Sequence, residues 1–318
     1  MTDASHVPVL LEQATSALAI RCDGIYVDAT FGRGGHSRRL LSALGPNGIV
    51  LAIDRDPDAE AAARSWSDPR LHFHRAWFSQ LPDVLDTEGV EQVDGVLLDL
   101  GVSSAQIDEP RRGFSLRGDG PLDMRMDPSR APSAAEWLAT VSERELKGVI
   151  ADYGEERFAQ QIARAIVTGR AHQPIARTRQ LAAIVAEAVG ARGRGDWSQD
   201  PATRTFQAIR IFINQELQEL SLTLDRILPR LRNGGRLAVI SFHSLEDRIV
   251  KQFMRRHSEP FGADARLARL AIATRALPEP PLVRVGRAVR ASDDEVAANP
   301  RARSAILRIA QRTSAVLS

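Results

Sequence analysis

Short apolar runs alternate with helix-like stretches over the first hundred residues. The runs are rich in Val, Ile and Leu, and the stretches between them have apolar residues at helical spacing. This pattern predicts parallel strands joined by crossover helices, the arrangement of a doubly wound α/β sheet. The expected strands are residues 25–28, 49–53, 71–74 and 95–98, and the expected helices are residues 36–43, 57–66 and 79–85.

The next strand of comparable quality, residues 236–240, comes more than a hundred residues later, after a turn of Asn and two Gly. The segment between begins with a turn-rich stretch, residues 108–132, which is too polar for a core. Helical spacing follows, and it ends in a long amphipathic helix over residues 203–231. The expected short helices of this segment are residues 133–139, 142–151, 155–168 and 178–189.

This spacing predicts an inserted helical subdomain within the sheet domain. We expect residues 1–106 and 205–318 to form the sheet domain and residues 107–204 to form the insertion. A helix over residues 245–256, an exposed loop running to residue 281 and a last strand over residues 304–310 complete the expected order.

Composition narrows the class of protein. The 318 residues are 43% hydrophobic and 26% charged, as in a soluble globular protein. No stretch approaches the roughly 20 apolar residues of a membrane helix, and the start lacks signal-peptide order, so we expect a cytoplasmic protein. Cys22 is the one cysteine, which excludes an intramolecular disulfide, and no spacing of Cys or His indicates a metal site.

The charge is unevenly distributed. Lys147 and Lys251 are the two lysines among 42 basic residues, and the net charge is +2. Residues 1–247 hold 28 basic and 34 acidic residues, whereas residues 248–318 hold 14 and 6, a balance of +8. A basic C-terminal quarter is typical of a protein with a polyanionic partner, and an Arg-rich genome with a solvated tail explains it equally well.

The strongest local motif runs from Tyr26 to Ser37, a strand that enters a glycine-rich turn and then a helix. Such a turn exposes backbone N–H groups to a ligand. A dinucleotide fingerprint needs a third glycine where this chain has Ser37. Asp28 with a compact Gly-x-Gly-Gly instead suits a ligand that has an amino acid end, such as S-adenosylmethionine (SAM).

Two acidic residues end the following strands. Asp54 is placed to accept both hydroxyls of a ribose, although Asp56 next to it is a typical helix N-cap. Trp77 and Phe78 follow the third strand and are either an apolar wall for adenine or core aromatics. Asp99 ends the fourth strand, at the edge where α/β sheets bind ligands.

Ser103, Ser104 and Gln106 lie on the loop beyond Asp99. The Asp-Pro-Pro-aromatic signature usual in amino methyltransferases is absent there. His243 follows the late strand in the analogous place and is a candidate for substrate contact or proton relay, or a structural histidine.

The chain resembles the bacterial 16S ribosomal RNA cytosine-N4 methyltransferases nearly from end to end. Several of the matching blocks are peculiar to that family, and Ala29 stands where glycine is also common. The blocks are residues 6–11, 28–37, 98–106, 120–127, 206–211, 240–248 and 299–304.

The resemblance implies a class I SAM-dependent methyltransferase fold, Rossmann-like, with a helical insertion, SAM as the methyl donor and 16S rRNA or the small ribosomal subunit as the partner. Matched by motif, it implies that Gly34, Gly35 and His36 contact the donor and that Asp54 binds its ribose. By the same matching, Phe78 lies near its adenine, and Asp99 and Gln106 complete the donor pocket.

We therefore expect SAM-dependent methylation of the N4 amino group of a cytosine in the decoding region of 16S rRNA. Asp99 and Ser103 are the expected catalytic residues, with His243 further out. The stretch over residues 111–130 and the basic tail are expected to contact RNA phosphates.

Three alternatives stay open: a DNA amino-methyltransferase, a SAM-binding ribosome-assembly or RNA-binding factor without turnover, and an NAD-dependent oxidoreductase. The sequence leaves two further points undecided. One is whether the substrate is naked rRNA or an assembled subunit, and the other is whether the protein is a monomer or forms an oligomer such as a homodimer.

Overall fold

The computed structural model describes residues 8–130, 132–190, 200–259 and 279–316. The chain forms two compact units. The sheet unit is Met1–Gly101 with Leu217–Ser318, and the helical unit is Val102–Glu216.

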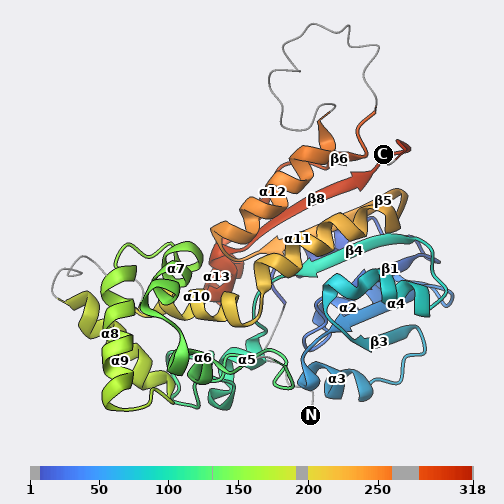
Figure 1. Ribbon diagram of the computed structural model, residues 1–318. Coiled ribbons are helices and arrows are strands. Elements are labelled where there is room, and N and C mark those ends of the chain that lie inside the picture. Colours follow the sequence, from blue (N-terminus) through green and yellow to red (C-terminus); the bar gives the residue numbers. More distant parts are fainter. Residues whose placement is uncertain (1–7, 131, 191–199, 260–278, 317–318) are drawn as a thin grey trace, which may run out of the picture. The chain divides into compact units, whose positions relative to one another are not determined.

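The sheet unit has one mixed sheet, which contains eight strands in the part of the chain that the structure describes. The order is β3-β2-β1-β4-β5-β8-β6, with β7 beside β8 (Figure 1). The first five are parallel, and β8 is antiparallel to β5 and β6. The bounds are β1 Ile25–Asp28, β2 Ile49–Asp54, β3 Leu71–Arg75, β4 Val93–Asp99, β5 Leu231–Ser241, β6 Leu282–Arg284, β7 Val289–Arg290 and β8 Ile306–Arg312.

This is a Rossmann-like doubly wound sheet, and it confirms the α/β class I methyltransferase fold expected from the sequence. The four early strands and both late ones lie within a few residues of the expected ranges. The strand β5 is longer than expected because the Asn-Gly-Gly turn lies inside it, and Leu231 pairs with Val93 before the turn.

Alternate residues of each strand pack on opposite faces of the sheet, as the two-residue period of a strand requires. Val27 and Val96 pack in a core with α4, α11 and α12, whereas Tyr26 and Leu97 pack in a core with α1 and α2. Both faces are therefore covered. The helices of this unit are α1 Leu11–Ala17, α2 Gly35–Ala43, α3 Pro57–Arg64, α4 Leu81–Thr87, α11 Glu216–Ile227, α12 Ser244–Ser258 and α13 Asp293–Ala298.

The helical unit has its own apolar core, to which every long helix contributes one face. Serine side chains cap the first turn of three of its helices: the hydroxyl oxygens of Ser103, Ser133 and Ser142 accept hydrogen bonds from the N–H groups of Gln106, Glu136 and Glu145. The helices are α5 Ser104–Asp108, α6 Ala134–Thr140, α7 Glu143–Gly154, α8 Ala159–His172, α9 Thr178–Val189 and α10 Thr203–Ile213.

The single long helix expected over residues 203–231 is wrong. The chain forms α10 and α11 instead, and Gln215 between them has a φ of 51°. The cause lies at Asn214, whose side-chain amide donates to the carbonyl oxygens of Met124 (2.7 Å) and Arg210 (2.9 Å) and accepts from the N–H of Met126 (2.8 Å). Apolar spacing continues across the break, so the pattern did not show it.

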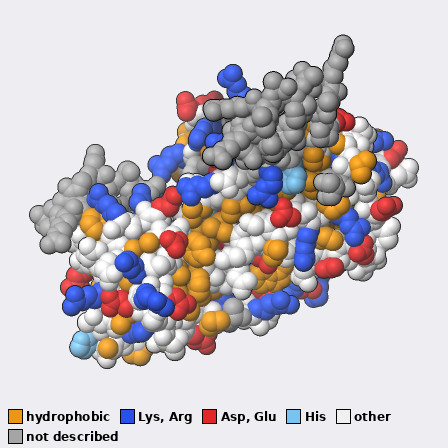
Figure 2. All heavy atoms as spheres, turned by 45° about the horizontal axis from the view of Figure 1, so that its top comes forward, with side chains coloured by type: hydrophobic (Ala, Val, Ile, Leu, Met, Phe, Trp, Pro, Cys, Tyr) orange, Lys and Arg blue, Asp and Glu red, His pale blue; other side chains and the backbone are white. Residues whose placement is uncertain are grey.

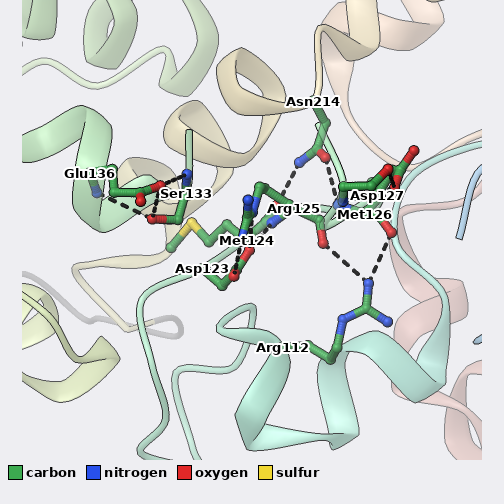
Figure 3. A network of polar contacts seen from close by, with 10 residues as sticks. Arg112, Asp123, Met124, Arg125, Met126, Asp127, Ser133, Glu136 and Asn214 are labelled. Carbon is green, nitrogen blue, oxygen red and sulfur yellow. Dashed lines mark hydrogen bonds and ion pairs between the residues drawn. The ribbon is translucent and has the colours of Figure 1, made fainter. Parts of the chain in front are cut away.

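The polar stretch over residues 108–132 was expected to stay out of the core, and this too is wrong. Leu122 and Met124 are 1% exposed and belong to the core of the helical unit. The Arg112 guanidinium is buried and donates to the carbonyl oxygens of Arg125 (3.1 Å) and Met126 (3.0 Å), as Figure 3 shows. Arginine therefore takes a structural role here, satisfying backbone groups that would otherwise be buried unpaired.

The helical unit begins a few residues before the expected insertion and ends later, at Glu216, because α10 packs against α7. The short elements α1, α5, β6, β7 and α13 were not predicted, and α5 replaces the loop expected around Ser104 and Gln106. Most of the loop expected before residue 281 lies outside the described residues.

Candidate functional site

The glycine-rich turn is tied at both ends to one buried carboxylate. Asp28, the last residue of β1, is fully buried. Its Oδ2 accepts from the Ser37 hydroxyl (2.7 Å) in the first turn of α2, and its Oδ1 accepts from the N–H of Thr30 (3.3 Å). Burial raises the pKa of Asp28, and the nearby His36 charge and the Ser37 hydroxyl act in the opposite direction. Both limbs of the turn are thereby held at the strand end.

Gly34 occupies a place that no other residue fits. Its φ is +77°, in the left-handed region. A Cβ there would lie 2.4 Å from the Trp66 ring and 2.7 Å from the Phe31 ring. At Gly35 a Cβ would lie 2.1 Å from the ring of Pro8. The glycine turn therefore packs against these three rings and has no room for side chains at these two positions.

Asp54, at the end of β2, bonds the same turn. Its Oδ2 accepts from the N–H of Gly32 (2.7 Å) and its Oδ1 accepts from the N–H of Asp56 (2.9 Å). Burial raises the pKa of Asp54 to about 6, against the opposing effect of these two backbone hydrogen bonds. Each carboxylate oxygen keeps a second lone pair, so the group can still accept ligand hydroxyls. Asp56 caps α3 through the N–H of Asp58, as the sequence predicted.

Asp99, at the end of β4, lies beside the turn. Its N–H donates to the Thr30 hydroxyl (2.7 Å), which fixes its backbone, and its Oδ2 lies 3.4 Å from His36 Nε2. Burial lowers the pKa of His36, but the Asp99 and Asp28 carboxylates outweigh that effect and raise it overall. The imidazolium form of His36 is thus favoured between two carboxylates.

Three polar atoms of this pair have no hydrogen-bond partner among the described residues although they are buried: Asp99 Oδ1 and both ring nitrogens of His36, of which Nε2 has only the 3.4 Å ion-pair contact with Asp99. A buried polar atom without a partner costs about 1–3 kcal/mol, so such atoms are rare unless a ligand pairs with them. Hydroxyl and ammonium donors of SAM match the acceptor at Asp99, and the ligand's carboxylate matches a donor such as His36. The residues present therefore fit this cofactor.

Phe78 begins the 3₁₀ turn Phe78–Gln80 after β3 and packs, partly exposed, against the core that includes β2 and β4. The Arg55 guanidinium stacks on the neighbouring Trp77 ring at 4.5 Å. Of these two aromatic residues, Phe78 is the one that packs on the core and also keeps part of its surface accessible to a ligand.

The other expected site residues have local structural partners. Ser103 and Gln106 belong to the helical unit and form the capping box of α5: Ser103 Oγ accepts from Gln106 N–H (3.2 Å), and Gln106 Oε1 accepts from Ser103 N–H (2.9 Å). His243 is the N-cap of α12, where its Nδ1 accepts from Glu246 N–H at 3.4 Å. This capping role alone accounts for the position of His243, and its role in catalysis stays a proposal.

Within the sheet unit the structure brings together Gly34, Gly35, His36, Asp54 and Asp99. The sequence did not reveal the roles of Thr30 and Ser37. The Thr30 hydroxyl accepts from the N–H of Asp99 while the Thr30 N–H donates to Asp28, and the Ser37 hydroxyl donates to Asp28. The available signal was a hydroxyl residue on each side of the glycines, and Ser37 was interpreted only as a missing glycine.

The described residues contain no group of three or more His, Cys, Asp or Glu side chains placed to hold a metal ion. None of their helices has the length and hydropathy to cross a membrane.

Comparison with known proteins gives long matches. The MraW methylase family matches residues 3–313. Ribosomal RNA small subunit methyltransferase H of Neisseria meningitidis serogroup A is 57% identical over 97% of this chain and 93% of its own length. The proteins of that name from Thiobacillus denitrificans (57%, covering 98% of both chains) and Methylobacillus flagellatus (58%, covering 98% of this chain and 95% of theirs) are equally similar.

Proposed function

Because this chain belongs to the MraW methylase family, it is a methyltransferase that uses SAM, and we propose that it methylates the N4 amino group of a cytosine in the decoding region of 16S rRNA. The unpaired, buried Asp99 oxygen beside the glycine turn is the observation that carries the assignment of the site. Relatives named as small-subunit rRNA methyltransferases support the choice of RNA over DNA as substrate.

The residues assigned to the donor are Gly34, Gly35, His36, Asp54, Phe78, Asp99 and Gln106. When bound, SAM supplies a methyl group on a positively charged sulfur. The glycine turn holds the amino acid end, and Asp54 accepts the ribose hydroxyls. This assignment leaves the sheet edge at Asp99 for the reacting groups.

A cytosine amino group is a weak nucleophile because its lone pair is delocalised into the ring. Positioning must therefore supply much of the rate. Asp99 would accept a hydrogen bond from the amino group of the flipped base and so position its nitrogen for methyl transfer, and Ser103 and His243 are the further residues that we propose for catalysis. The nitrogen would gain the methyl group as the methyl carbon–sulfur bond of the donor breaks, the donor would leave as a neutral thioether, and the amino group would release one proton to solvent.

The direct test is methyl transfer from labelled SAM to small ribosomal subunits that lack the modification, with naked rRNA and duplex DNA in parallel. Nucleoside mass spectrometry then identifies the product. We expect N4-methylcytidine with rRNA or subunits and none with DNA. SAM binding without any methylated nucleoside would support an assembly factor, and methylation of duplex DNA would support a DNA enzyme.

The pKa of Asp54 predicts that SAM binding depends on pH. A carboxyl with a pKa of about 6 is ionised above that pH and protonated below it, and the ionised form is the better acceptor for ribose hydroxyls. Affinity should therefore fall as the pH drops through 6, about tenfold between about pH 8 and about pH 5, since only the ionised fraction binds well. Calorimetric titration with SAM at a series of pH values measures the affinity.

The control is the Asp54→Asn variant, in which the affinity for SAM should be low at every pH. An unchanged pH profile in that variant would assign the titration to another group.

The basic tail predicts an RNA contact at the C-terminal end of α12. Arg255 and Arg256 are exposed there, and Arg255 also pairs with Glu259 at 3.2 Å. Changing both to Glu should weaken rRNA binding about tenfold or more and reduce its salt dependence, because each phosphate contact releases counterions. Filter binding over a salt titration measures both quantities. An unaltered slope would remove these two residues from the RNA surface, and SAM affinity is the control.

A further inference from the structure

A hollow lies on the sheet unit where α12 meets β6 and β8. Its polar lining is basic: Lys251 from α12, Arg284 and Arg287 from β6 and the segment after it, and Arg308 from β8. Met254 and Val285 supply apolar contacts. Four cationic side chains from three segments of the chain therefore converge on one surface depression.

Within the described part of the chain, most charges of this hollow have no acidic partner. Asp247 is the acidic residue that pairs with it, and both of its carboxylate oxygens bond Arg308 (2.6 and 2.9 Å). Lys251, Arg284 and Arg287 have no ion-pair or hydrogen-bond partner among the described residues, and all three are exposed.

Elsewhere the basic residues commonly have acidic neighbours. On the face drawn in Figure 2, Lys and Arg side chains are interspersed with Asp and Glu side chains. Arg39 pairs with Glu12 at 2.9 Å, and Arg64 pairs with Glu60 at 2.5 Å. A group of three unpartnered cations is energetically unfavourable in the free protein through mutual repulsion, and a bound anion relieves that repulsion.

The backbone around the hollow is fixed by the sheet. Arg284 is paired with Ala310 of β8, and the N–H of Val285 donates to the carbonyl oxygen of Ile309 (3.0 Å). Gly286 then turns the chain with a φ of 68° before Arg287. Lys251, Arg284 and Arg308 thus lie on regular elements of the sheet unit, and Arg287 lies in the turn after β6. A backbone fixed in this way lowers the entropy cost of binding a ligand.

We propose that this hollow binds backbone phosphates of the rRNA substrate, at nucleotides other than the cytosine that is methylated. The site rests on the proposed function, since it assumes RNA as the partner. Phosphate oxygens are suitable ligands for this hollow because Arg offers two parallel N–H donors and Lys a compact positive charge. Contacts of this kind bind the backbone without distinguishing one base from another.

The first test changes Lys251, Arg284 and Arg287 together to Gln and measures rRNA affinity, its salt slope and methylation kinetics. We expect binding weaker by about a hundredfold at low salt and a slope lower by about 2, at roughly 0.7 for each single-strand contact. The KM for RNA rises while kcat and SAM affinity stay unchanged.

Arg64→Gln is the matched control. It removes one exposed arginine charge on α3, which packs beside β3 at the opposite edge of the sheet. It should leave the salt slope unchanged. A triple variant with the wild-type slope would overturn the proposal, whereas wild-type protein that fails to methylate rRNA would overturn the proposed function instead.

The second test needs no variant. The chain has two lysines, Lys147 on α7 and Lys251, and both are exposed. Acetylation of the full-length protein with and without RNA, read by peptide mass spectrometry, should show protection of Lys251 by naked rRNA, with Lys147 as the internal reference. The same labelling is repeated with small subunits, because either form of the rRNA can be the substrate. Labelling of Lys251 that neither naked rRNA nor small subunits reduce would overturn the proposal.

Discussion

Methyl transfer falls by at least about 10²- to 10³-fold in an Asp99→Ala variant, the range measured when one preorganised polar group is removed from an active site. The carboxylate ends β4, its backbone is fixed by the Thr30 hydroxyl, and its Oδ1 is buried and free for a ligand. Alanine removes that acceptor and also removes the carboxylate that lies 3.4 Å from His36 Nε2. Single-turnover transfer of labelled methyl groups to rRNA measures the loss.

The control separates the two roles assigned to Asp99. Asp99→Asn keeps the shape of the side chain, and its SAM affinity is measured by calorimetry beside its rate at saturating SAM. A rate near wild type at saturating SAM would make Asp99 a donor-binding residue and remove it from catalysis. A thermal melt of each variant shows whether the sheet unit stays folded.

Gly34→Val should abolish SAM binding and lower the free energy of unfolding by more than about 2 kcal/mol. A β-branched residue at a φ of +77° costs on the order of 1–2 kcal/mol in backbone strain alone. The added Cβ also meets the Trp66 and Phe31 rings at 2.4 and 2.7 Å, so the turn must move. Urea denaturation and SAM titration measure the two effects.

Gly89 provides the matched control, because its φ is +66° and a Cβ there would meet nothing within 4 Å. Gly89→Val therefore carries the strain without the clash and lies outside the turn. It should lose stability but keep SAM affinity. If both variants bind SAM like the wild type, the glycine turn does not hold the donor.

Much of the sheet was predictable because its strands are buried on both faces and appear as short apolar runs between turn residues. The ends of those runs also located Asp28, Asp54 and Asp99. The break after α10 was hidden for a different reason. Asn214 makes its three hydrogen bonds with backbone groups of residues 124, 126 and 210, and two of these lie far away in the sequence.

The same limit applies to the polar stretch around Met124. Its polarity predicted exposure to solvent. In the structure, however, Arg112 donates to a nearby backbone carbonyl and Arg125 pairs with Asp123. Local composition records the number of polar groups and says nothing about their partners. The hydroxyls of Thr30 and Ser37 were overlooked in the site for this reason also.

The position of β8 affects the order in which the sheet is completed during synthesis. This strand, residues 306–312, lies between β5 and β6 in the sheet, yet it is synthesised after the other seven strands of the described residues. Until then β5 presents an open edge of unpaired N–H and C=O groups, which is prone to pair with other chains. The glycine turn, Asp54 and Asp99 lie on strands made much earlier, so the donor site can form before the sheet closes. A chain cut short before β8 should therefore aggregate rather than bind its RNA.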